Sequence, residues 1–310
     1  MELSFSFPWE ALLIQWLQAH MGPAAVTLAA AVTLLGDQLA TVGILGFLYW
    51  CWDKEYGRFV GLNLVAASLW NPMVKNLVLR RRPYFDLPGV RCLKPVEPDA
   101  DLYDLHAQGY SFPSGHSTGA AATYVSLPLY RRRRRLTAAA VVIPFLVGLS
   151  RVCLGVHYPT DVLAGWALGL LAVFLLSLLQ KRISRRGIFA ILLLSGLPGW
   201  FFCHNSDFYS AYGLLLGFAA ATAFEEKYVR FENTRVPWRC VLRMAGGVAV
   251  YLGLNALLKL PFDRAFLASD GFLPHLVRAL RYAVVAFADI GVYPLAFRPA
   301  GERREPPPAA

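Results

Sequence analysis

Two histidines of the 310-residue chain lie in short polar stretches whose residue types could do chemistry. Asp161 follows His157 by four residues, so its carboxylate can accept a hydrogen bond from one ring nitrogen and leave the other free to attack. His116 follows Ser114 and Gly115 in a turn that feeds a run of small residues. Taken alone, the His157 stretch fits a polar turn with a helix-capping aspartate equally well. The His116 stretch, taken alone, fits an ordinary Pro-Ser-Gly turn equally well.

The Ser114-Gly115 turn could bind an anion, and three cations lie in the neighbouring polar stretches. Unpaired N–H groups at a helix N-terminus favour an anion, and Ser114 could cap the helix or donate to a ligand oxygen. Lys75 and Arg82 are separated by about two helical turns, so both can point the same way. Arg151 ends another apolar run. A lysine near an apolar run is costly unless it faces a polar pocket, although snorkelling to the membrane surface is the more ordinary interpretation of Lys75 alone.

Long apolar runs surround these polar stretches. The chain is 56% hydrophobic and 16% charged, whereas ordinary soluble domains are about 45–50% apolar and about 25% charged. A helix that crosses a membrane needs about 20 mostly apolar residues, so the sequence predicts an all-α protein, a polytopic membrane helix bundle of about ten helices. The predicted helices cover 22–36, 38–52, 59–79, 116–130, 137–150, 162–180, 187–203, 208–224, 241–258 and 275–297.

The charges predict which way the bundle faces. The formal net charge is +10, and most of the 30 Lys and Arg residues lie in one set of loops, which the positive-inside rule assigns to the cytoplasm. The stretches around the histidines lie on the opposite, non-cytoplasmic side. The run Arg131–Arg135 could instead bind nucleic acid or anionic lipid, but a short loop between apolar runs is where topology signals are expected. The cytoplasmic set occupies 54–58, 131–135, 181–186, 227–243 and 298–304.

Together, the polar stretches form the pattern K-x6-R-P, P-S-G-H and S-R-x5-H-x3-D at 75–83, 113–116 and 150–161. This pattern resembles the three-part signature of the type 2 phosphatidic acid phosphatase superfamily. That superfamily also includes glucose-6-phosphatase, sphingosine-phosphate phosphatases and vanadium haloperoxidases. Every signature position is filled, and the order and separations fit. The resemblance covers roughly residues 37–183 and implies an active membrane phosphatase.

The resemblance implies a role for each matching residue. His157 resembles the family's nucleophile, which forms a phosphohistidine, and Asp161 would orient and polarise it. His116 would protonate the leaving oxygen and then activate the hydrolytic water. No metal or other cofactor is implied, because fixed cations can stabilise a transferred phosphoryl group as metal ions do elsewhere. The phosphoryl oxygens would be bound by Lys75, Arg82, Ser114, Gly115 and Arg151.

The chain divides into three parts around this resemblance. Residues 1–36 would hold an interfacial helix, marked by Trp9 and Trp16, and the first span. Residues 37–183 would form a six-helix phosphatase core. Residues 184–310 would add about four more helices, a C-terminal transmembrane extension, and a short cytoplasmic tail. The start of the chain is acidic rather than basic, so we expect no removable signal peptide.

The depth of the site and the resemblance predict a substrate held in the membrane. This would be a lipid phosphate or an isoprenoid diphosphate such as undecaprenyl diphosphate; monoester and diphosphate both stay open, as does a soluble sugar phosphate. We expect a multi-pass integral protein of the plasma membrane, with its active site on the non-cytoplasmic face and no nucleic-acid partner; its oligomeric state is left open. Two alternatives also stay open: a phosphotransferase that passes the phosphate to a second lipid or sugar, and a non-catalytic transporter or scaffold of the same fold.

Further features invite a role. The acidic segment Asp99–His106 could hold a divalent cation, although a solvated loop is the better interpretation. Arg80 and Arg81 adjoin the first motif and could contact the substrate, but we expect both at the membrane interface. Asp289 lies in the last apolar run, about two turns after Arg281. An acid there suggests a function, but pairing with a neighbouring helix fits equally well. The five cysteines do not form a disulfide framework, and no spacing favours a particular pair.

Overall fold

The computed structural model describes residues 5–297, and the elements among them are all helices. The all-α prediction is therefore confirmed for this part of the chain. Residues 1–4 and 298–310 lie outside the described residues. The latter segment includes the predicted tail cations Arg298, Arg303 and Arg304.

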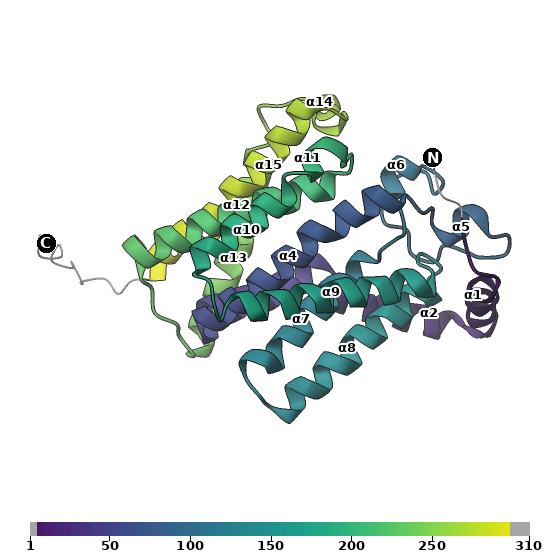
Figure 1. The fold of residues 1–310 in the computed structure, drawn as a ribbon, viewed down its shortest axis with the longest axis horizontal. Coiled ribbons are helices and arrows are strands. Elements are labelled where there is room, and N and C mark those ends of the chain that lie inside the picture. Colours follow the sequence, from purple (N-terminus) through teal and green to yellow (C-terminus); the bar gives the residue numbers. More distant parts are fainter. Residues whose placement is uncertain (1–4, 298–310) are drawn as a thin grey trace, which may run out of the picture.

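The core that carries the predicted site consists of α4 (Lys54–Val78), α7 (Gly115–Tyr130), α8 (Arg134–Cys153) and α9 (Pro159–Leu179). Helix α7 is rich in small residues and packs against the other three, which run beside it along the long axis of the molecule (Figure 1). Two glycines let α9 approach closely. A Cβ at Gly165 would lie 2.7 Å from the Ser114 carbonyl oxygen, and one at Gly169 would lie 2.6 Å from that of Thr118. The start of α9 is thereby held against the start of α7.

The helical segments before the core are α1 (Pro8–His20), α2 (Pro23–Val32), the 3-10 turn η1 (Thr33–Gly36), α3 (Gln38–Gly46) and the π-helical η2 (Phe47–Trp52). The helix from α2 through η1 is bent by 119° from α1. Trp9 and Trp16 of the predicted interfacial helix are exposed, whereas Glu10 and Gln18 on the same helix are buried. Helix α1 therefore has a polar buried side that docks on the rest of the protein.

The segment between α4 and α7 forms the predicted outer loop and contains two short helices, α5 (Pro83–Asp86) and α6 (Leu105–Gln108). Buried Gln108 holds this loop together. Its side chain accepts a hydrogen bond from the N–H of Val96 at 3.0 Å and donates one to the carbonyl of Glu97 at 2.9 Å. Its backbone carbonyl accepts from Arg82, so the loop is anchored directly to the first motif.

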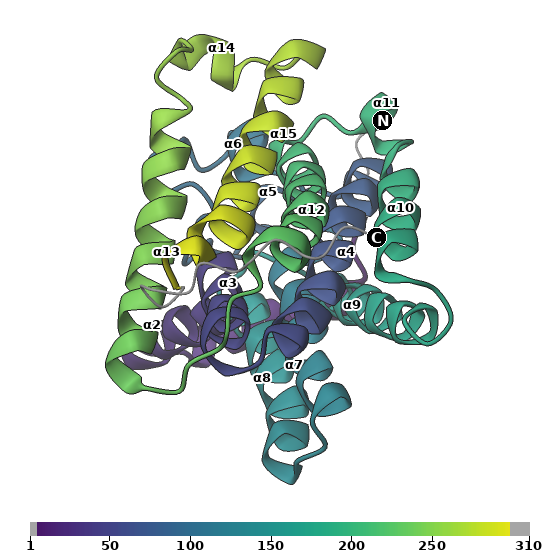
Figure 2. The same ribbon diagram turned by 90° about the vertical axis from the view of Figure 1, so that its left-hand side faces the viewer.

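The C-terminal part comprises α10 (Arg185–Gly196), α11 (Gly199–Phe202), α12 (Ser206–Phe224), η3 (Glu225–Val229), α13 (Pro237–Leu257), α14 (Arg264–Ala268), α15 (Phe272–Phe287), η4 (Ala288–Val292) and η5 (Tyr293–Phe297). Figure 2 shows α13 at one edge of the molecule, α10 at the other, and α12 and α15 between them. Helix α12 packs on α4 and on α15, and the shared apolar core includes Leu69, Phe208, Leu215 and Phe218. The additional C-terminal helices predicted from the sequence are therefore present.

Among the described residues, four helices are each long and apolar enough to cross a membrane: α8, α9, α13 and the helix from Phe272 to Phe297. The bent pair of α1 and α2–η1 would be a fifth span if counted as one. The other predicted spans form helices that are shorter or more polar, such as Gln38–Trp52 and α4. Packing inside the bundle explains the polarity of α4, because many of its residues are buried in protein rather than exposed to lipid.

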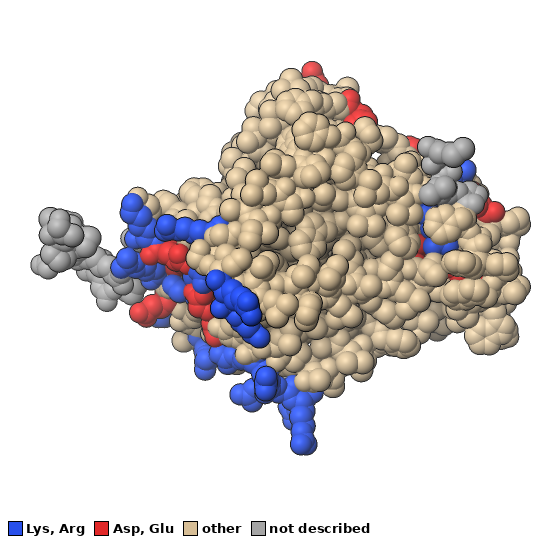
Figure 3. Space-filling view, viewed as in Figure 1, with Lys and Arg blue, Asp and Glu red and all other residues tan. Residues whose placement is uncertain are grey.

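A broad uncharged surface crosses the middle of the molecule, and Lys and Arg side chains gather beyond it at one end (Figure 3). Loops of the predicted cytoplasmic set meet there. Arg131 pairs with Asp53 at 3.0 Å, and Lys54 pairs with Glu225 at 2.9 Å. A surface free of charged side chains is what the hydrocarbon core of a lipid bilayer requires. The protein is an integral membrane protein, and the side that each end faces remains a prediction.

Candidate active site

His157 lies on the short connection between α8 and α9, and its side chain is 3% exposed. Its Nδ1 lies 3.4 Å from Oδ2 of Asp161, the third residue of α9. The same oxygen accepts a hydrogen bond from the N–H of Tyr158 at 2.8 Å, which caps the start of α9 and fixes the carboxylate. The carboxylate therefore faces Nδ1 and leaves Nε2 for the remainder of the site.

Arg82 lies beside that second ring nitrogen. Its Nη1 is 3.4 Å from Nε2 of His157 and donates a hydrogen bond to the carbonyl of Val156 at 3.0 Å. Its Nε donates to the carbonyls of Gln108 at 2.8 Å and Gly109 at 3.0 Å. Backbone oxygens thus hold the buried guanidinium in one position next to the nitrogen that would attack.

Lys75 is buried near the end of α4 and reaches the segment just before α7. Its Nζ donates hydrogen bonds to the carbonyls of Tyr110 at 2.9 Å and Pro113 at 3.2 Å. Asn71, one turn earlier, donates to Thr118 Oγ1 at 2.9 Å. The snorkelling interpretation of Lys75 is therefore wrong. The lysine turns inward because these polar groups, rather than lipid headgroups, surround its ammonium.

Arg151 is buried in the last turn of α8 and contacts a segment that the motifs did not include. Its Nη1 donates to Thr33 Oγ1 in η1 at 3.2 Å. Its Nε has no hydrogen-bond partner among the described residues. A buried guanidinium with a spare donor is suited to an anionic oxygen.

Ser114 caps α7, and Gly115 is the first residue of that helix. The Ser114 hydroxyl accepts a hydrogen bond from the Ser117 hydroxyl at 3.0 Å. The Ser114 N–H donates to the carbonyl of Asp161 at 3.0 Å, so it joins the second and third motifs directly. The Ser117 N–H donates to the Ser114 hydroxyl at 3.4 Å, whereas the N–H groups of Gly115 and His116, earlier in the first turn of α7, remain suited to an anion.

His116 faces a carboxylate that sequence reasoning missed. Its Nε2 lies 3.8 Å from Oδ2 of Asp37, the residue that caps α3. Gly36 permits this approach, because a Cβ there would lie 2.5 Å from Val147 Cγ1 and 3.1 Å from the His116 carbonyl oxygen. The available signal is an aspartate between two apolar runs, a position that carries no information about a contact across the fold.

Each of the three motifs places a cation or a titratable side chain near His157. Burial and the nearby cations Arg82, Arg151 and Lys75, with His116, hold the pKa of His157 well below its usual value. The ring is therefore neutral at neutral pH, as a nucleophilic imidazole must be. The motif residues predicted to act together are brought to one place, at the end of the bundle opposite the cation-rich loops.

Arg80 is not at the membrane interface, so that prediction is wrong. It is fully buried and donates to Asp161 Oδ1 at 2.8 Å. Leu79 ends α4 in the left-handed conformation, with φ of 53°, and the chain then leaves the helix. Alternate residues of a non-helical segment point to opposite sides. Arg80 and Arg82 are accordingly buried, whereas Arg81 is partly exposed and pairs with Asp86 at 3.4 Å.

Other candidate residues have different roles. Within residues 5–297, no group of three or more His, Cys, Asp or Glu side chains could hold a metal ion. Asp101 and Asp104 instead cap turns by accepting from the N–H groups of Tyr103 and His106. Asp289 is buried, and its Oδ1 has no hydrogen-bond partner among the described residues. Arg281 does not pair with it but donates to Asn255 at 2.9 Å. All five cysteines are free.

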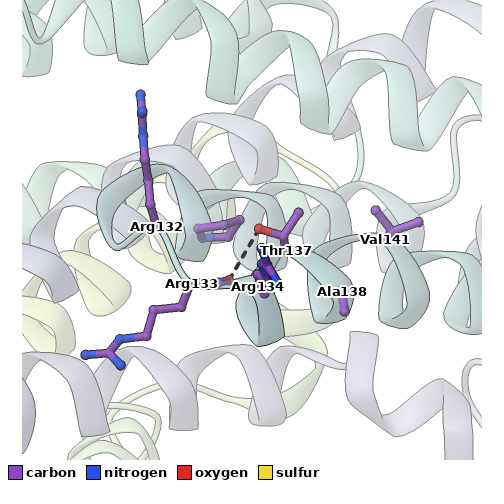
Figure 4. Close-up of a pocket in the computed structure, with 7 residues that line it drawn as sticks. Arg132, Arg133, Arg134, Thr137, Ala138 and Val141 are labelled. Carbon is purple, nitrogen blue, oxygen red and sulfur yellow. Dashed lines mark hydrogen bonds between the residues drawn. The ribbon is translucent and has the colours of Figure 1, made fainter.

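A groove of about 540 Å³ lies at the turn between α7 and α8, at the cation-rich end. Its lining includes Arg132, Arg133 and Arg134 and none of the motif residues. Figure 4 shows the side chains of Arg132 and Arg133 pointing in different directions. These cations do not converge on one point, and the motif cluster remains the candidate active site.

Comparison with known proteins gives two family matches. Residues 57–185 match the PAP2 superfamily, and residues 209–304 match the family described as PAP2 superfamily phosphatase, transmembrane extension. Phosphatidylglycerophosphatase B of Bacillus subtilis is 34% identical over 180 residues, which cover 55% of this chain and 78% of that protein.

A second relative and a solved structure are also similar to this chain. Undecaprenyl-diphosphatase BcrC of Bacillus subtilis is 40% identical over 123 residues, which are 40% of this chain and 57% of that protein. The crystal structure of Aquifex aeolicus LpxE matches with a TM-score of 0.48 and 22% identity, over 56% of this chain and 98% of that one. The family matches and the long alignment to the first relative agree with the motif set. The chain therefore belongs to the PAP2 superfamily of membrane phosphatases.

Proposed function

We propose that this protein hydrolyses a lipid phosphate or an isoprenoid diphosphate through a phosphohistidine at His157. The observation that carries the proposal is the placement of one buried imidazole between Asp161, 3.4 Å from Nδ1, and Arg82, 3.4 Å from Nε2. The carboxylate favours the charge that develops on the ring as Nε2 attacks. The guanidinium lies where the phosphoryl oxygens would be.

In the first step, Nε2 of His157 forms a bond to phosphorus while the bond between phosphorus and the leaving oxygen breaks. His116 donates a proton to that oxygen, and the Asp37 carboxylate lies 3.8 Å from its Nε2. In the second step, neutral His116 takes a proton from water as the water oxygen attacks phosphorus. The N–P bond breaks, and phosphate is released with both histidines restored.

Three cations and one helix end would hold the phosphoryl group during both steps. Lys75, Arg82 and Arg151 are buried and interact electrostatically with one another. Their positions are fixed by backbone carbonyls and by Thr33. Such preorganised charge needs no rearrangement when the transition state forms. The N–H groups at the start of α7 would add donors.

The membrane supplies the argument for a lipid substrate. Arg151 lies in the last turn of α8 and Asp161 in the first turn of α9, which are both candidate membrane spans. We therefore expect the site near the level of the lipid headgroups, where the head of a lipid could enter it while the tail stays in the bilayer. The named relatives are a phosphatidylglycerophosphatase and an undecaprenyl-diphosphatase, which supports both a monoester and a diphosphate. The site would open on the non-cytoplasmic face of the plasma membrane, because the opposite end carries the excess of cations.

The test is phosphate release by the purified protein in detergent, with a panel of lipid mono- and diphosphates and vanadate as inhibitor. We expect His157→Ala to abolish release, whereas His204→Ala, an exposed histidine after α11, keeps it. Full release by His157→Ala would refute the mechanism. A phosphorylated acceptor in place of free phosphate would show a phosphotransferase, and wild-type protein that releases nothing from any substrate would favour a transporter or scaffold.

A further inference from the structure

Arg80 bridges two buried carboxylates that come from opposite parts of the chain. Its Nη1 donates to Asp161 Oδ1 at 2.8 Å, and its Nη2 donates to Glu10 Oε2 at 2.7 Å. All three side chains are 0% exposed. The Tyr158 ring covers the guanidinium, with its centroid 3.7 Å from the central carbon. Two carboxylates share one cation, so the group carries an excess of negative charge next to His157.

Glu10 is held as firmly as Asp161. Its Oε1 accepts hydrogen bonds from the N–H of Thr160 at 3.1 Å and from the Thr160 hydroxyl at 2.6 Å. Its Oε2 also accepts from the N–H of Phe7 at 2.9 Å. Thr160 and Asp161 are neighbours in the first turn of α9, so α1 is fastened to the turn that carries the partner of His157.

The sharing of Arg80 has an electrostatic consequence. A buried cation paired with a single carboxylate would cancel most of the electric field of that carboxylate. Screening by water is weak in the interior, so the field of the cation is strong there. Glu10 offsets the charge of Arg80, so Asp161 keeps its negative field toward Nδ1 of His157. That field matters most once Nε2 bonds to phosphorus and the ring becomes cationic.

We propose that Arg80 and Glu10 are positioning residues of the nucleophile: Arg80 fixes the Asp161 carboxylate, and Glu10 preserves the negative charge that it presents to His157. This inference rests on the proposed role of His157. Neither residue belongs to the motif set, and Glu10 lies outside the matched region 57–185. Helix α1 is accordingly a working part of the active site.

Each element packed around His157 contributes a charged or titratable group that faces it. They are Lys75 from α4, Arg82 after it, His116 from α7, Arg151 from α8 and Asp161 from α9. Glu10 and Arg80 act behind Asp161. All of these cations disfavour a protonated His157, and Asp161 is the carboxylate that opposes them.

The test compares Glu10→Gln and Arg80→Lys with matched controls on the same segments. Gln18→Ala removes the other buried polar anchor of α1, which bonds Arg91 and Cys153, and Arg81→Lys changes the neighbouring arginine. We expect kcat/KM to fall roughly 10- to 100-fold in both test variants, with KM little changed and phosphoenzyme formation slowed. The two controls should keep kcat/KM close to that of wild type.

A pH profile separates the charge effect from loosened structure. Removing the charge of Glu10 weakens the field of Asp161, so His157 in Glu10→Gln should protonate at lower pH than in wild type. The acid limb of kcat/KM then moves to lower pH although the plateau is lower, whereas a loosened fold would lose activity sooner in acid. Glu10→Asp, which keeps the charge, should restore the wild-type limb even if Glu10→Gln folds poorly.

Each other result overturns the inference. Glu10→Gln with wild-type plateau and profile would do so, as would Gln18→Ala showing the same loss. Glu10→Asp that moves the acid limb as Glu10→Gln does would also remove the charge argument. Full turnover in His157→Ala would refute the proposed function and this inference together. If His157→Ala loses turnover and any of the three results above is observed, only the inference is refuted.

Discussion

At the residue scale, the acid limb of activity should report His157. Burial and Arg82 lower the pKa of His157. The ring therefore stays neutral at pH values below its usual pKa of about 6.5 and is protonated as the pH falls further. Protonation removes the attacking lone pair, so kcat/KM should hold its plateau below pH ~6.5 and fall at lower pH. Rates measured from pH 4 to 9 check this. A half-maximal rate above pH ~6.5 on the acid side would contradict it.

The lowered pKa of His157 also makes the stability of the folded protein depend on pH. An unfolded chain binds a proton at His157 near pH ~6.5, and the folded protein does so at lower pH, so acid favours the unfolded state through this residue. His157→Ala should therefore unfold with less dependence on pH between those two pKa values. Thermal unfolding in detergent at several pH values measures the difference.

Asp37 offers a second residue-scale prediction. Its carboxylate lies 3.8 Å from Nε2 of His116 and is partly exposed, so its effect is moderate. Asp37→Asn should lower kcat/KM roughly 10-fold, a fraction of the ~10²–10⁴-fold that a general acid contributes, and move the alkaline limb to lower pH. Asparagine still caps α3, so the change isolates the charge. Asp86→Asn is the control, and an unmoved alkaline limb would exclude Asp37 from the proton transfer.

At the scale of elements, the contact between α7 and α9 should be intolerant of any side chain at Gly169. A Cβ there would meet the Thr118 carbonyl at 2.6 Å, so Gly169→Ala must separate the two helices that carry His116 and Asp161. We expect a loss of about 1–3 kcal/mol in the free energy of unfolding, together with lower kcat. Gly43→Ala is the control, because nothing lies within 4 Å of a Cβ there. Equal thermal stability of the two variants would contradict the packing argument.

Local patterns predicted some elements and missed others for identifiable reasons. The motif residues Lys75, Arg82 and His157 could be singled out because their types and spacing are rare in apolar sequence. Arg80 and Asp37 could not, because their roles come from packing between segments far apart in the chain. Arg80 contacts α1 at a sequence separation of 70, which no local periodicity encodes.

At the scale of the whole molecule, a buried ion cluster joins the core to the C-terminal extension. Glu225, after α12, is 0% exposed and pairs with Lys54 and with the buried Arg58 of α4. Glu225→Gln leaves Arg58 with weaker compensation, so we expect a loss of about 3–5 kcal/mol in the free energy of unfolding. Thermal unfolding in detergent measures it, with the exposed Glu232→Gln as control. Similar stability of both variants would show that the cluster does not hold the extension.

The separation of cations between the two ends of the molecule was easier to predict from the sequence than the number of membrane-spanning helices. Topology follows from loop composition, which is local, and the described cations of the predicted cytoplasmic loops do gather at one end. Hydropathy alone could not show that polar residues of α4, such as Asn63 and Asn71, are buried among neighbouring helices.

The docking of α1 has a consequence for biosynthesis. Glu10 is made 70 residues before Arg80 and 150 before Thr160, so its carboxylate emerges from the ribosome long before any of these partners exist. An unpaired carboxylate resists transfer out of water, so we expect α1 to wait in the aqueous or headgroup layer while later helices insert. Nascent chains released before α9 should therefore be cleaved by protease within α1, and full-length chains should be protected there.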